Sequence, residues 1–351
     1  MCMKTVKAKG EFLPYLDPCH GRRDDAPCSF APWRRALGRG PRLLRQIPRR
    51  TAAGGRIACL ARAVLLCAAG LALAHGAPAN AQGAPCDADA PACEIAGGRY
   101  FVRLPAGPGP HPAVMFLHGY GGSGDGALRA PARLGPLIAG GWAVIAPDGA
   151  RRGADGPRGW NAMAWPQGRD DVAFLGAVAD DAARRFGLDR ARIAASGFSA
   201  GGMMTWRLMC DAPDAYVAFA PVAGTLWKPI PARCAGPAPL LHVHGTADTV
   251  VPMAGRSLGG GRIVQGDLTE ALAMLRASMG CAEPGRAGLP PAAPADWQGE
   301  TWADCAGRGA ITLLTHGGGH VAPRGWAEVA LAFFAAHPGP AIPLAQGEAR
   351  R

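Results

Sequence analysis

The sequence lacks an uncharged apolar run of the roughly 20 residues that a membrane-spanning helix requires, because glycines and prolines interrupt its apolar stretches. A multi-pass membrane protein is therefore excluded. Charged residues are also scarce, at 18% of the 351 residues against 49% apolar residues. This balance excludes a mainly disordered chain and provides enough apolar side chains for a sizeable core.

Lysine is nearly absent from residues 82–351, where Lys228 is the only one. The net charge of +11 is concentrated in residues 1–81, which hold 14 of the 37 Lys and Arg residues and 4 of the 26 Asp and Glu residues. The remainder is close to neutral, and it has no basic stripe with interleaved aromatic residues. We expect no nucleic-acid partner.

Residues 1–81 have the pattern of a basic leader that contains a secretory signal peptide. Several arginines precede the apolar run at 63–74, and Ala79-Asn80-Ala81 follows it as an A-x-A cleavage site. A short buried helix is the alternative interpretation of this run. The leader is longer than the usual length of roughly 15–30 residues, which indicates a translation start assigned too early. We predict a secreted or periplasmic protein.

Cysteine usage points to the same compartment. Five of the 11 cysteines fall in the leader, and an even number remains beyond it. An even number in an exported chain predicts three disulfides, with free buried thiols as the alternative. Pairing neighbours in sequence order would close short loops, although the sequence alone allows every other pairing. The six cysteines are Cys86, Cys93, Cys210, Cys234, Cys281 and Cys305.

From Arg99 onward, short β-like runs alternate with helical stretches, which predicts an α/β fold with a mostly parallel central sheet and helices on both faces. We expect one domain over 82–337, followed by a short flexible tail at 338–351. Strands are expected at Tyr100–Leu104, Ala113–Leu117, Trp142–Ala146, Ile193–Ser196, Val217–Val222, Leu240–His244 and Ile311–Thr315. Helices are expected at Asp171–Phe186, Ala200–Cys210, Thr269–Ser278 and Trp326–Ala336.

A candidate nucleophile, Ser199, lies between an expected strand and an expected helix. It forms a Gly-x-Ser-x-Gly pattern with Gly197 and Gly201. A serine at the top of a strand needs a sharp, strained turn, and small residues two positions before and after it let strand and helix pass closely. The order of strand, motif and helix therefore predicts a nucleophilic serine.

The same pattern occurs a second time, around Ser257. That copy follows a proline, precedes a run of glycines and opens no apolar helix. We therefore interpret Ser257 as a loop serine.

A serine nucleophile requires a base, and an acid behind that base, at the same edge of the sheet. In doubly wound hydrolases the chain order is serine, acid, histidine. Asp248 follows an apolar strand in a loop bounded by Gly and Pro, and it is our predicted acid. Asp211 and Asp214 also follow the serine, but they are expected to be solvated loop residues.

Two histidines are candidates for the base. His316 ends a strand, whereas His320 lies beyond three glycines that allow the loop to fold over the serine. We therefore predict His320 as the base. His242 and His244 alternate on a strand and resemble metal ligands when taken with Asp248, but no third ligand cluster accompanies them. We predict no metal and no cofactor.

The transition state of acyl transfer places negative charge on the carbonyl oxygen, which two backbone N–H groups usually stabilise. One predicted donor is Ala200, the residue after the nucleophile. The second comes from the Gly-rich turn after an early strand, where Tyr120 or Gly121 is the donor. A phosphate-binding loop is the alternative, but that motif requires a lysine and none is nearby.

In combination, these motifs resemble the secreted polyhydroxybutyrate depolymerase / feruloyl esterase family of α/β-hydrolases, over residues from about 95 to 337. The order of the motifs makes this resemblance specific. The matching segments are His118-Gly-Tyr-Gly-Gly, Gly141-Trp-Ala-Val-Ile-Ala-Pro147-Asp148-Gly149, Gly159-Trp160-Asn161, Asp170-Asp171-Val-Ala-Phe174-Leu, Ser196-Gly-Phe-Ser-Ala-Gly-Gly-Met-Met204, His244-Gly-Thr-Ala-Asp248 and Gly317-Gly-Gly-His320.

The resemblance implies a single-domain α/β-hydrolase that acts as a serine carboxylesterase, with Ser199, Asp248 and His320 as its triad. It also implies the disulfides 210–234 and 281–305. Trp160 and Asn161, with Gly121, match positions near the substrate cleft of relatives, although a core Trp in an Asn turn is the alternative. Two departures put polymer preference in doubt. Ala322 replaces an aromatic residue that relatives often carry, and no binding module follows Gly339.

The predicted function is therefore an exported serine ester hydrolase that works through an acyl-enzyme. Its expected substrates are feruloyl or acetyl esters, including esters linked to polysaccharide, or short polyhydroxyalkanoate oligoesters. Acyl transfer and peptide cleavage on the same fold are alternatives, and so is a noncatalytic polymer-binding protein. The sequence predicts no oligomeric state.

Overall fold

The computed structural model describes residues 86–339, all of which belong to one compact unit. The predicted leader at 1–81, with its signal peptide, lies outside the described residues, as do residues 340–351 of the predicted tail. Within the described part of the chain, no helix has the length and apolar character needed to cross a membrane.

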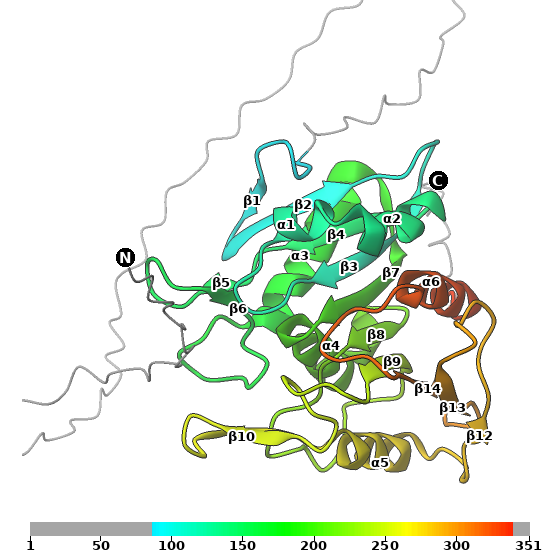
Figure 1. The fold of residues 1–351 in the computed structure, drawn as a ribbon. Coiled ribbons are helices and arrows are strands. Elements are labelled where there is room, and N and C mark those ends of the chain that lie inside the picture. The colour runs from blue at the N-terminus through cyan, green and yellow to red at the C-terminus, as the bar shows by residue number, and fades with distance from the viewer. Residues whose placement is uncertain (1–85, 340–351) are drawn as a thin grey trace, which may run out of the picture. The chain divides into compact units, whose positions relative to one another are not determined.

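A ten-stranded sheet forms the centre of the fold (Figure 1). Its six inner strands are mutually parallel, as predicted. In spatial order they are β4 (Ala143–Pro147), β3 (His111–Leu117), β7 (Leu188–Phe198), β8 (Phe219–Val222), β9 (Pro239–Gly245) and β14 (Ala310–His316). Antiparallel strands extend both sides of this group. They are β2 (Gly98–Arg103) and β1 (Cys93–Ile95) beyond β4, and β13 (Gln298–Trp302) and β12 (Arg286–Ala287) beyond β14.

Helices cover both faces of the sheet, and each face has its own core cluster. Strand β3 shows why: Met115 and Leu117 belong to one cluster, whereas Val114 and Phe116 belong to the other, as the two-residue period of a strand dictates. The first cluster contains α3 (Asp171–Phe186), α4 (Ala200–Asp211) and α5 (Leu268–Met279). The second contains α1 (Gly124–Leu128), α2 (Pro131–Ala139) and α6 (Trp326–Ala336).

The predicted helix boundaries agree with the structure where the sequence carries clear end signals. Helix α3 begins after Asp170, whose carboxylate accepts a hydrogen bond of 3.0 Å from Ala173 N, and it ends at Gly187 in the left-handed conformation. All seven predicted strands are present. Helix α2 was not predicted because it contains Gly135 and Pro136, and it is held by packing against α6.

The short edge strands were also missed by sequence reasoning. Strand β13 is only partly buried, so it lacks the continuous apolar run that identified the inner strands. Two small hairpins were missed for the same reason. They are β5 (Ala150–Arg151) with β6 (Arg158–Gly159), and β10 (Arg256–Leu258) with β11 (Ile263–Gln265).

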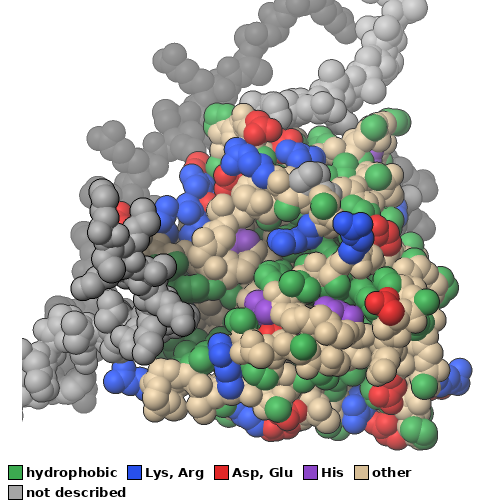
Figure 2. Space-filling view, viewed as in Figure 1, with side chains coloured by type: hydrophobic (Ala, Val, Ile, Leu, Met, Phe, Trp, Pro, Cys, Tyr) green, Lys and Arg blue, Asp and Glu red, His purple; other side chains and the backbone are tan. Residues whose placement is uncertain are grey.

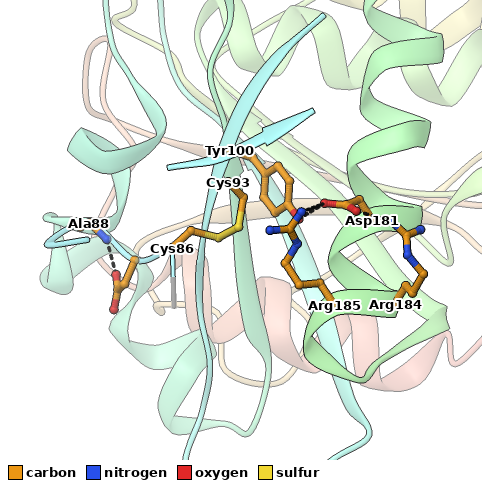
Figure 3. The surroundings of a disulfide bond; sticks show 8 residues. Cys86, Ala88, Cys93, Tyr100, Asp181, Arg184 and Arg185 are labelled. Carbon is orange, nitrogen blue, oxygen red and sulfur yellow. Dashed lines mark hydrogen bonds and ion pairs between the residues drawn. A yellow bond between two sulfur atoms is a disulfide. The ribbon is translucent and has the colours of Figure 1, made fainter. Parts of the chain in front are cut away.

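The first disulfide, Cys86–Cys93, closes the start of the described chain against the edge of the sheet. Figure 3 shows the Tyr100 ring between this disulfide and helix α3. Tyr100 is fully buried, and its hydroxyl donates a hydrogen bond to Asp181 on that helix. Burial raises the pKa of Tyr100, so the phenol remains a donor at neutral pH.

The other two disulfides are Cys210–Cys234 and Cys281–Cys305. The first ties the end of α4 to the loop that precedes β9. The second ties the residue after the α5 C-cap to the turn between β13 and β14. All six cysteines beyond the predicted leader are therefore paired with their sequence neighbours.

Removing Cys210–Cys234 with a double alanine variant should lower the free energy of unfolding by about 3 kcal/mol, because the cross-link restricts the unfolded chain. Denaturant unfolding measures this change. The matched variant removes Cys86–Cys93, whose sequence separation is 7 rather than 24. Its loss should be smaller by about 1 kcal/mol. A larger loss for the shorter loop would contradict the loop-entropy explanation.

Candidate active site

The candidate catalytic residues come from loops at the carboxyl edge of the parallel strands. Ser199 follows β7, Asp248 follows β9 and His320 follows β14. The Gly-rich turn that contains Tyr120 follows β3 at the same edge. Open parallel sheets bind ligands at this edge, because it is where the loops after several strands converge.

Ser199 occupies a strained backbone conformation, with φ 57° and ψ −119°. The turn is fixed by a hydrogen bond of 2.9 Å from Ser199 N to Val222 O on the neighbouring strand β8. A Cβ at Gly201 would lie 2.0 Å from the carbonyl oxygen of Leu117, and one at Gly197 would lie 2.5 Å from the carbonyl oxygen of Gly201. Both motif glycines are therefore required by backbone contact.

The three side chains form a continuous hydrogen-bond chain. The Ser199 hydroxyl lies 2.9 Å from His320 Nε2, and His320 Nδ1 lies 2.7 Å from Asp248 Oδ2. The Phe198 ring packs against the His320 ring, with 4.9 Å between the ring centroids. In this geometry the imidazole can accept the serine proton on one nitrogen while its other N–H donates to the carboxylate.

Asp248 is the deepest of the three, with a side chain that is 0% exposed against 16% for His320. Its second oxygen, Oδ1, accepts hydrogen bonds of 2.8 Å from both Val250 N and Val251 N. The carboxylate thus has three donors, which offset the cost of burying a charge. Residues 86–339 contain no group of three or more His, Cys, Asp or Glu side chains placed to hold a metal ion.

The rejected candidates have other contacts. His316 Nδ1 accepts a hydrogen bond of 3.0 Å from Gly318 N, and its ring packs against Trp297. Burial lowers the pKa of His316, so its ring is neutral.

The other carboxylates that follow the serine form ion pairs. Asp211 pairs with Arg207, and Asp214 pairs with Arg308. Ser257 lies in the exposed hairpin strand β10 rather than in a loop, and the next element is strand β11 rather than a helix.

The predicted oxyanion donors lie on either side of Ser199. Ala200 N belongs to the first residue of helix α4, where a backbone N–H has no acceptor within the helix and the helix dipole favours negative charge. Gly121 N instead donates a hydrogen bond of 2.8 Å to Arg158 O. Gly121 N is therefore used within the turn, and Tyr120 stays the predicted second donor.

The turn that contains Tyr120 is held by His118, which is buried. His118 Nε2 accepts a hydrogen bond of 2.9 Å from Gly149 N, so Nδ1 carries the proton and donates to Gly119 O at 2.7 Å. Burial lowers the pKa of His118, in agreement with a neutral ring. The Trp160 indole N–H donates to His118 O at 2.8 Å. Trp160 is only 5% exposed, and its ring packs against the His118 ring with 5.0 Å between the centroids, so these contacts agree with the alternative of a core Trp.

Asn161 organises the loop that follows Trp160. Its side-chain amide donates to Trp165 O at 3.0 Å and to Arg169 O at 3.1 Å, and its carbonyl oxygen accepts from Trp165 N at 2.9 Å. These bonds fix the backbone of Trp165, whose ring is partly exposed. Sequence reasoning named Asn161 and missed Trp165.

A buried ionic group beneath the oxyanion turn was also missed. Asp148, at the end of β4, lies 2.7 Å from Arg99 Nε and 3.0 Å from Arg158 Nε, and it accepts a hydrogen bond of 2.7 Å from Gly124 N. Arg158 O also accepts the hydrogen bond from Gly121 N, so Arg158 connects Asp148 to the turn that contains Tyr120. The available signal was a carboxylate directly after an apolar strand.

Large apolar side chains on the active-site loops are exposed to solvent. Arg152 links two of them, since its guanidinium carbon lies 5.6 Å from the Tyr120 ring centroid and 5.7 Å from that of Trp165. We call this set the apolar rim, and it consists of Tyr120, Trp165, Val250 and Val321, exposed by 46%, 36%, 44% and 47%. Figure 2 shows histidine side chains reaching the surface among hydrophobic ones in the middle of the viewed face. Basic side chains on that face are scattered rather than gathered in a stripe.

Comparison with known proteins places these observations among esterases. No protein-family profile matches the sequence. The chain is 32% identical over 262 residues to the putative esterase NocK of Nocardia uniformis, covering 66% of this chain and 73% of that protein. Feruloyl esterase C of Emericella nidulans is 27% identical over 193 residues, which is 52% of this chain and 66% of that enzyme.

Two further comparisons are more limited. Feruloyl esterase B of Piromyces equi is 37% identical over 123 residues, but the match spans only 32% of this chain and 22% of that enzyme. The solved structure of acetyl xylan esterase from Aspergillus awamori has a TM-score of 0.50 at 14% identity, covering 68% of this chain and 94% of that one. At this identity the similarity concerns the fold alone.

The contacts at the nucleophile turn predict opposite effects for two Gly→Ala changes. Gly201→Ala should lower the free energy of unfolding by about 1–3 kcal/mol and reduce turnover, because strand and helix must separate. Gly176 lies in helix α3, and no atom lies within 4 Å of an added Cβ there. Gly176→Ala should therefore raise the free energy of unfolding by about 0.5–1 kcal/mol and leave activity unchanged. Urea unfolding and ester turnover test both. Equal effects of the two changes would argue against a tight approach at Gly201.

Proposed function

Because the chain belongs to the polyhydroxybutyrate depolymerase / feruloyl esterase family of α/β-hydrolases, we propose that it hydrolyses carboxylic esters with Ser199 as nucleophile, His320 as base and Asp248 as acid. The unbroken hydrogen-bond chain from the Ser199 hydroxyl to the Asp248 carboxylate carries this proposal. Family membership supports the reaction class, and the geometry supports the choice of residues.

In the first step, His320 Nε2 takes the Ser199 proton as the hydroxyl oxygen attacks the ester carbonyl carbon. The resulting oxyanion accepts hydrogen bonds from Ala200 N and Tyr120 N. The tetrahedral intermediate then collapses, the bond to the alcohol oxygen breaks, and His320 returns the proton to that oxygen. The products of this step are the free alcohol and an acyl-enzyme on Ser199.

In the second step, water replaces the alcohol. His320 removes a proton from the water, whose oxygen attacks the acyl carbon, and the same two N–H groups stabilise the oxyanion. The bond to Ser199 breaks, and the proton on His320 returns to the serine oxygen. Asp248 stays ionised throughout and stabilises the imidazolium that forms transiently in each step.

We propose that the enzyme works in an oxidising compartment, either secreted or periplasmic. The three disulfides within residues 86–339 are consistent with this location, because cytosolic thiols are normally kept reduced. The proposed signal peptide at 1–81 would direct export and leave the esterase domain at 82–337 with a short tail at 338–351.

The apolar rim favours substrates that present an apolar or aromatic group beside the scissile ester. Feruloyl esters attached to polysaccharide have such a group on the acyl side, and short hydroxyalkanoate oligoesters are apolar on both sides. Acetyl esters offer only a methyl group. We therefore propose that aromatic or oligomeric esters are better substrates than acetyl esters.

Ser199→Ala should reduce turnover of a small ester by several orders of magnitude, because the nucleophile is lost. Asp248→Asn should reduce it by about 10⁴-fold by favouring the wrong tautomer of the base. Release of acid from methyl ferulate, p-nitrophenyl butyrate and hydroxybutyrate oligomers by residues 82–351 provides the measurement.

Ser257→Ala is the matched control, since Ser257 stands in the second Gly-x-Ser-x-Gly pattern of the chain. It should leave turnover unchanged. Retention of activity by Ser199→Ala would refute the proposed mechanism. Acyl transfer to an added alcohol in preference to water would instead favour the transferase alternative.

Trp165→Ala should lower kcat/KM for methyl ferulate by up to about tenfold, because a ring in the rim contributes roughly 0.5–1.5 kcal/mol to an aromatic contact. The value for p-nitrophenyl acetate measures the effect on a short acyl group and should change much less. Leu104→Ala is the control: Leu104 is also 36% exposed, but it follows β2 at the opposite edge of the sheet. Equal losses on both substrates would exclude a role of Trp165 in selecting the acyl group.

A further inference from the structure

Three buried side chains lie beneath the catalytic acid and take no part in the mechanism above. They are Trp206 on helix α4 and His242 and His244 on strand β9, each exposed by 1% or less. The Trp206 indole Nε1 lies 3.2 Å from His242 Nδ1, and His242 Nε2 lies 2.9 Å from His244 Nδ1. His244 Nε2 in turn lies 2.8 Å from Val251 O. We call this series of hydrogen bonds the Trp206–Val251 chain.

The two ends of the Trp206–Val251 chain determine where every proton lies. An indole N–H can only donate, so His242 Nδ1 must accept and His242 must carry its proton on Nε2. That proton is donated to His244 Nδ1, which places the proton of His244 on Nε2. A carbonyl oxygen can only accept, so Val251 O receives it. Both rings are therefore neutral and held in the Nε2–H tautomer.

Electrostatics agrees with this assignment. Burial lowers the pKa of His244, and burial together with the neighbouring His244 lowers the pKa of His242 well below its ordinary value. A second proton on either ring would point an N–H at another donor. The Val251 carbonyl and the Asp248 carboxylate, whose Oδ2 lies 3.6 Å from His244 Nε2, act in the opposite direction on the pKa of His244, but burial is the larger effect.

The Trp206–Val251 chain ends at a residue that is also hydrogen-bonded to the catalytic acid. Val251 receives the His244 proton on its carbonyl oxygen, and its own N–H donates to Asp248 Oδ1 at 2.8 Å. Oδ1 is therefore turned toward the backbone, which leaves Oδ2 for His320. The N–H and the carbonyl of Val251 belong to successive peptide units joined at the Val251 Cα, so loss of the His244 donor would leave the carbonyl unpaired and loosen the residue whose N–H binds the carboxylate.

We propose that His244, held in one tautomer by His242 and Trp206, is a positioning residue that keeps Asp248 Oδ2 directed at His320. This inference rests on the proposed function. It assigns to two histidines with the spacing of metal ligands a role in orienting the acid. It also means that helix α4, which carries the oxyanion donor Ala200, is joined to the acid loop by hydrogen bonds as well as by packing.

Two variants of similar size separate this role from simple packing. The amide of Gln reaches about as far as the Nε2 of His, so His244→Gln keeps a donor near Val251 O. The amide of Asn reaches only as far as Nδ1, so His244→Asn leaves that oxygen unpaired. We expect His244→Asn to lower kcat by about 10–100-fold with KM changed less than about threefold, because the acid and base lose their alignment. His244→Gln should restore most of the loss.

The tautomers are tested on the unaltered protein. Nitrogen-15 NMR of the imidazole rings should show both His242 and His244 protonated on Nε2 alone. The downfield proton of the His320–Asp248 hydrogen bond should be present in the wild type, shifted or lost in His244→Asn, and recovered in His244→Gln.

The inference is overturned if His244 is protonated on Nδ1, or if His244→Asn keeps at least a third of the wild-type kcat. Since the NMR measurement needs no variant, it decides the matter even if His244→Asn does not fold. Ser199→Ala is assayed in parallel. If Ser199→Ala is inactive while His244→Asn is normal, only this inference fails. If Ser199→Ala is active, the proposed function fails first.

Discussion

The backbone contact between helix α4 and strand β3 is the constraint on which the site depends. Gly201 touches the carbonyl of Leu117 so closely that no Cβ fits, and this approach brings the first turn of α4 to the end of the parallel strands. The chain can make that approach only through the strained turn at Ser199. The strained turn at Ser199 and the position of Ala200 N at the start of α4 therefore have one common cause.

The remaining site residues are positioned relative to the same helix. The oxyanion turn follows β3, whose last residue supplies the carbonyl against which α4 packs. The acid loop follows β9, and the Trp206–Val251 chain joins this loop to α4. The proposed nucleophile, oxyanion donors and acid are thus all positioned relative to helix α4. His320 lies on a loop with three glycines after β14, and in the proposed mechanism it exchanges protons with substrate and water.

Sequence reasoning identified those parts of the fold that carry local signals. Buried parallel strands appear as apolar runs, and capped helices such as α3 have readable ends, whereas α2 and the edge strands depend on packing that no local pattern records. The same division holds within the site. Ser199, Asp248 and His320 lie on the segments that follow three parallel strands, in a fixed order, so their convergence could be predicted. Whether Trp160 faces substrate or core depends on how its loop folds, and the exposure of Trp165 depends on bonds made by Asn161.

The Asp248 side chain is fully buried whereas the His320 side chain is partly exposed. This difference explains why several polar side chains are buried around Asp248. A carboxylate with no exposed surface is tolerated only when its oxygens are fully hydrogen-bonded, and Asp248 has two backbone donors in addition to His320. Those backbone donors are useful only if the loop that carries them stays in place, and the hydrogen bond from His244 to Val251 O holds the next peptide group of that loop. An apolar residue at 244 would fill the same space and leave that carbonyl buried without a donor, which itself costs about 1–3 kcal/mol. The buried histidines therefore follow from placing the acid out of reach of water.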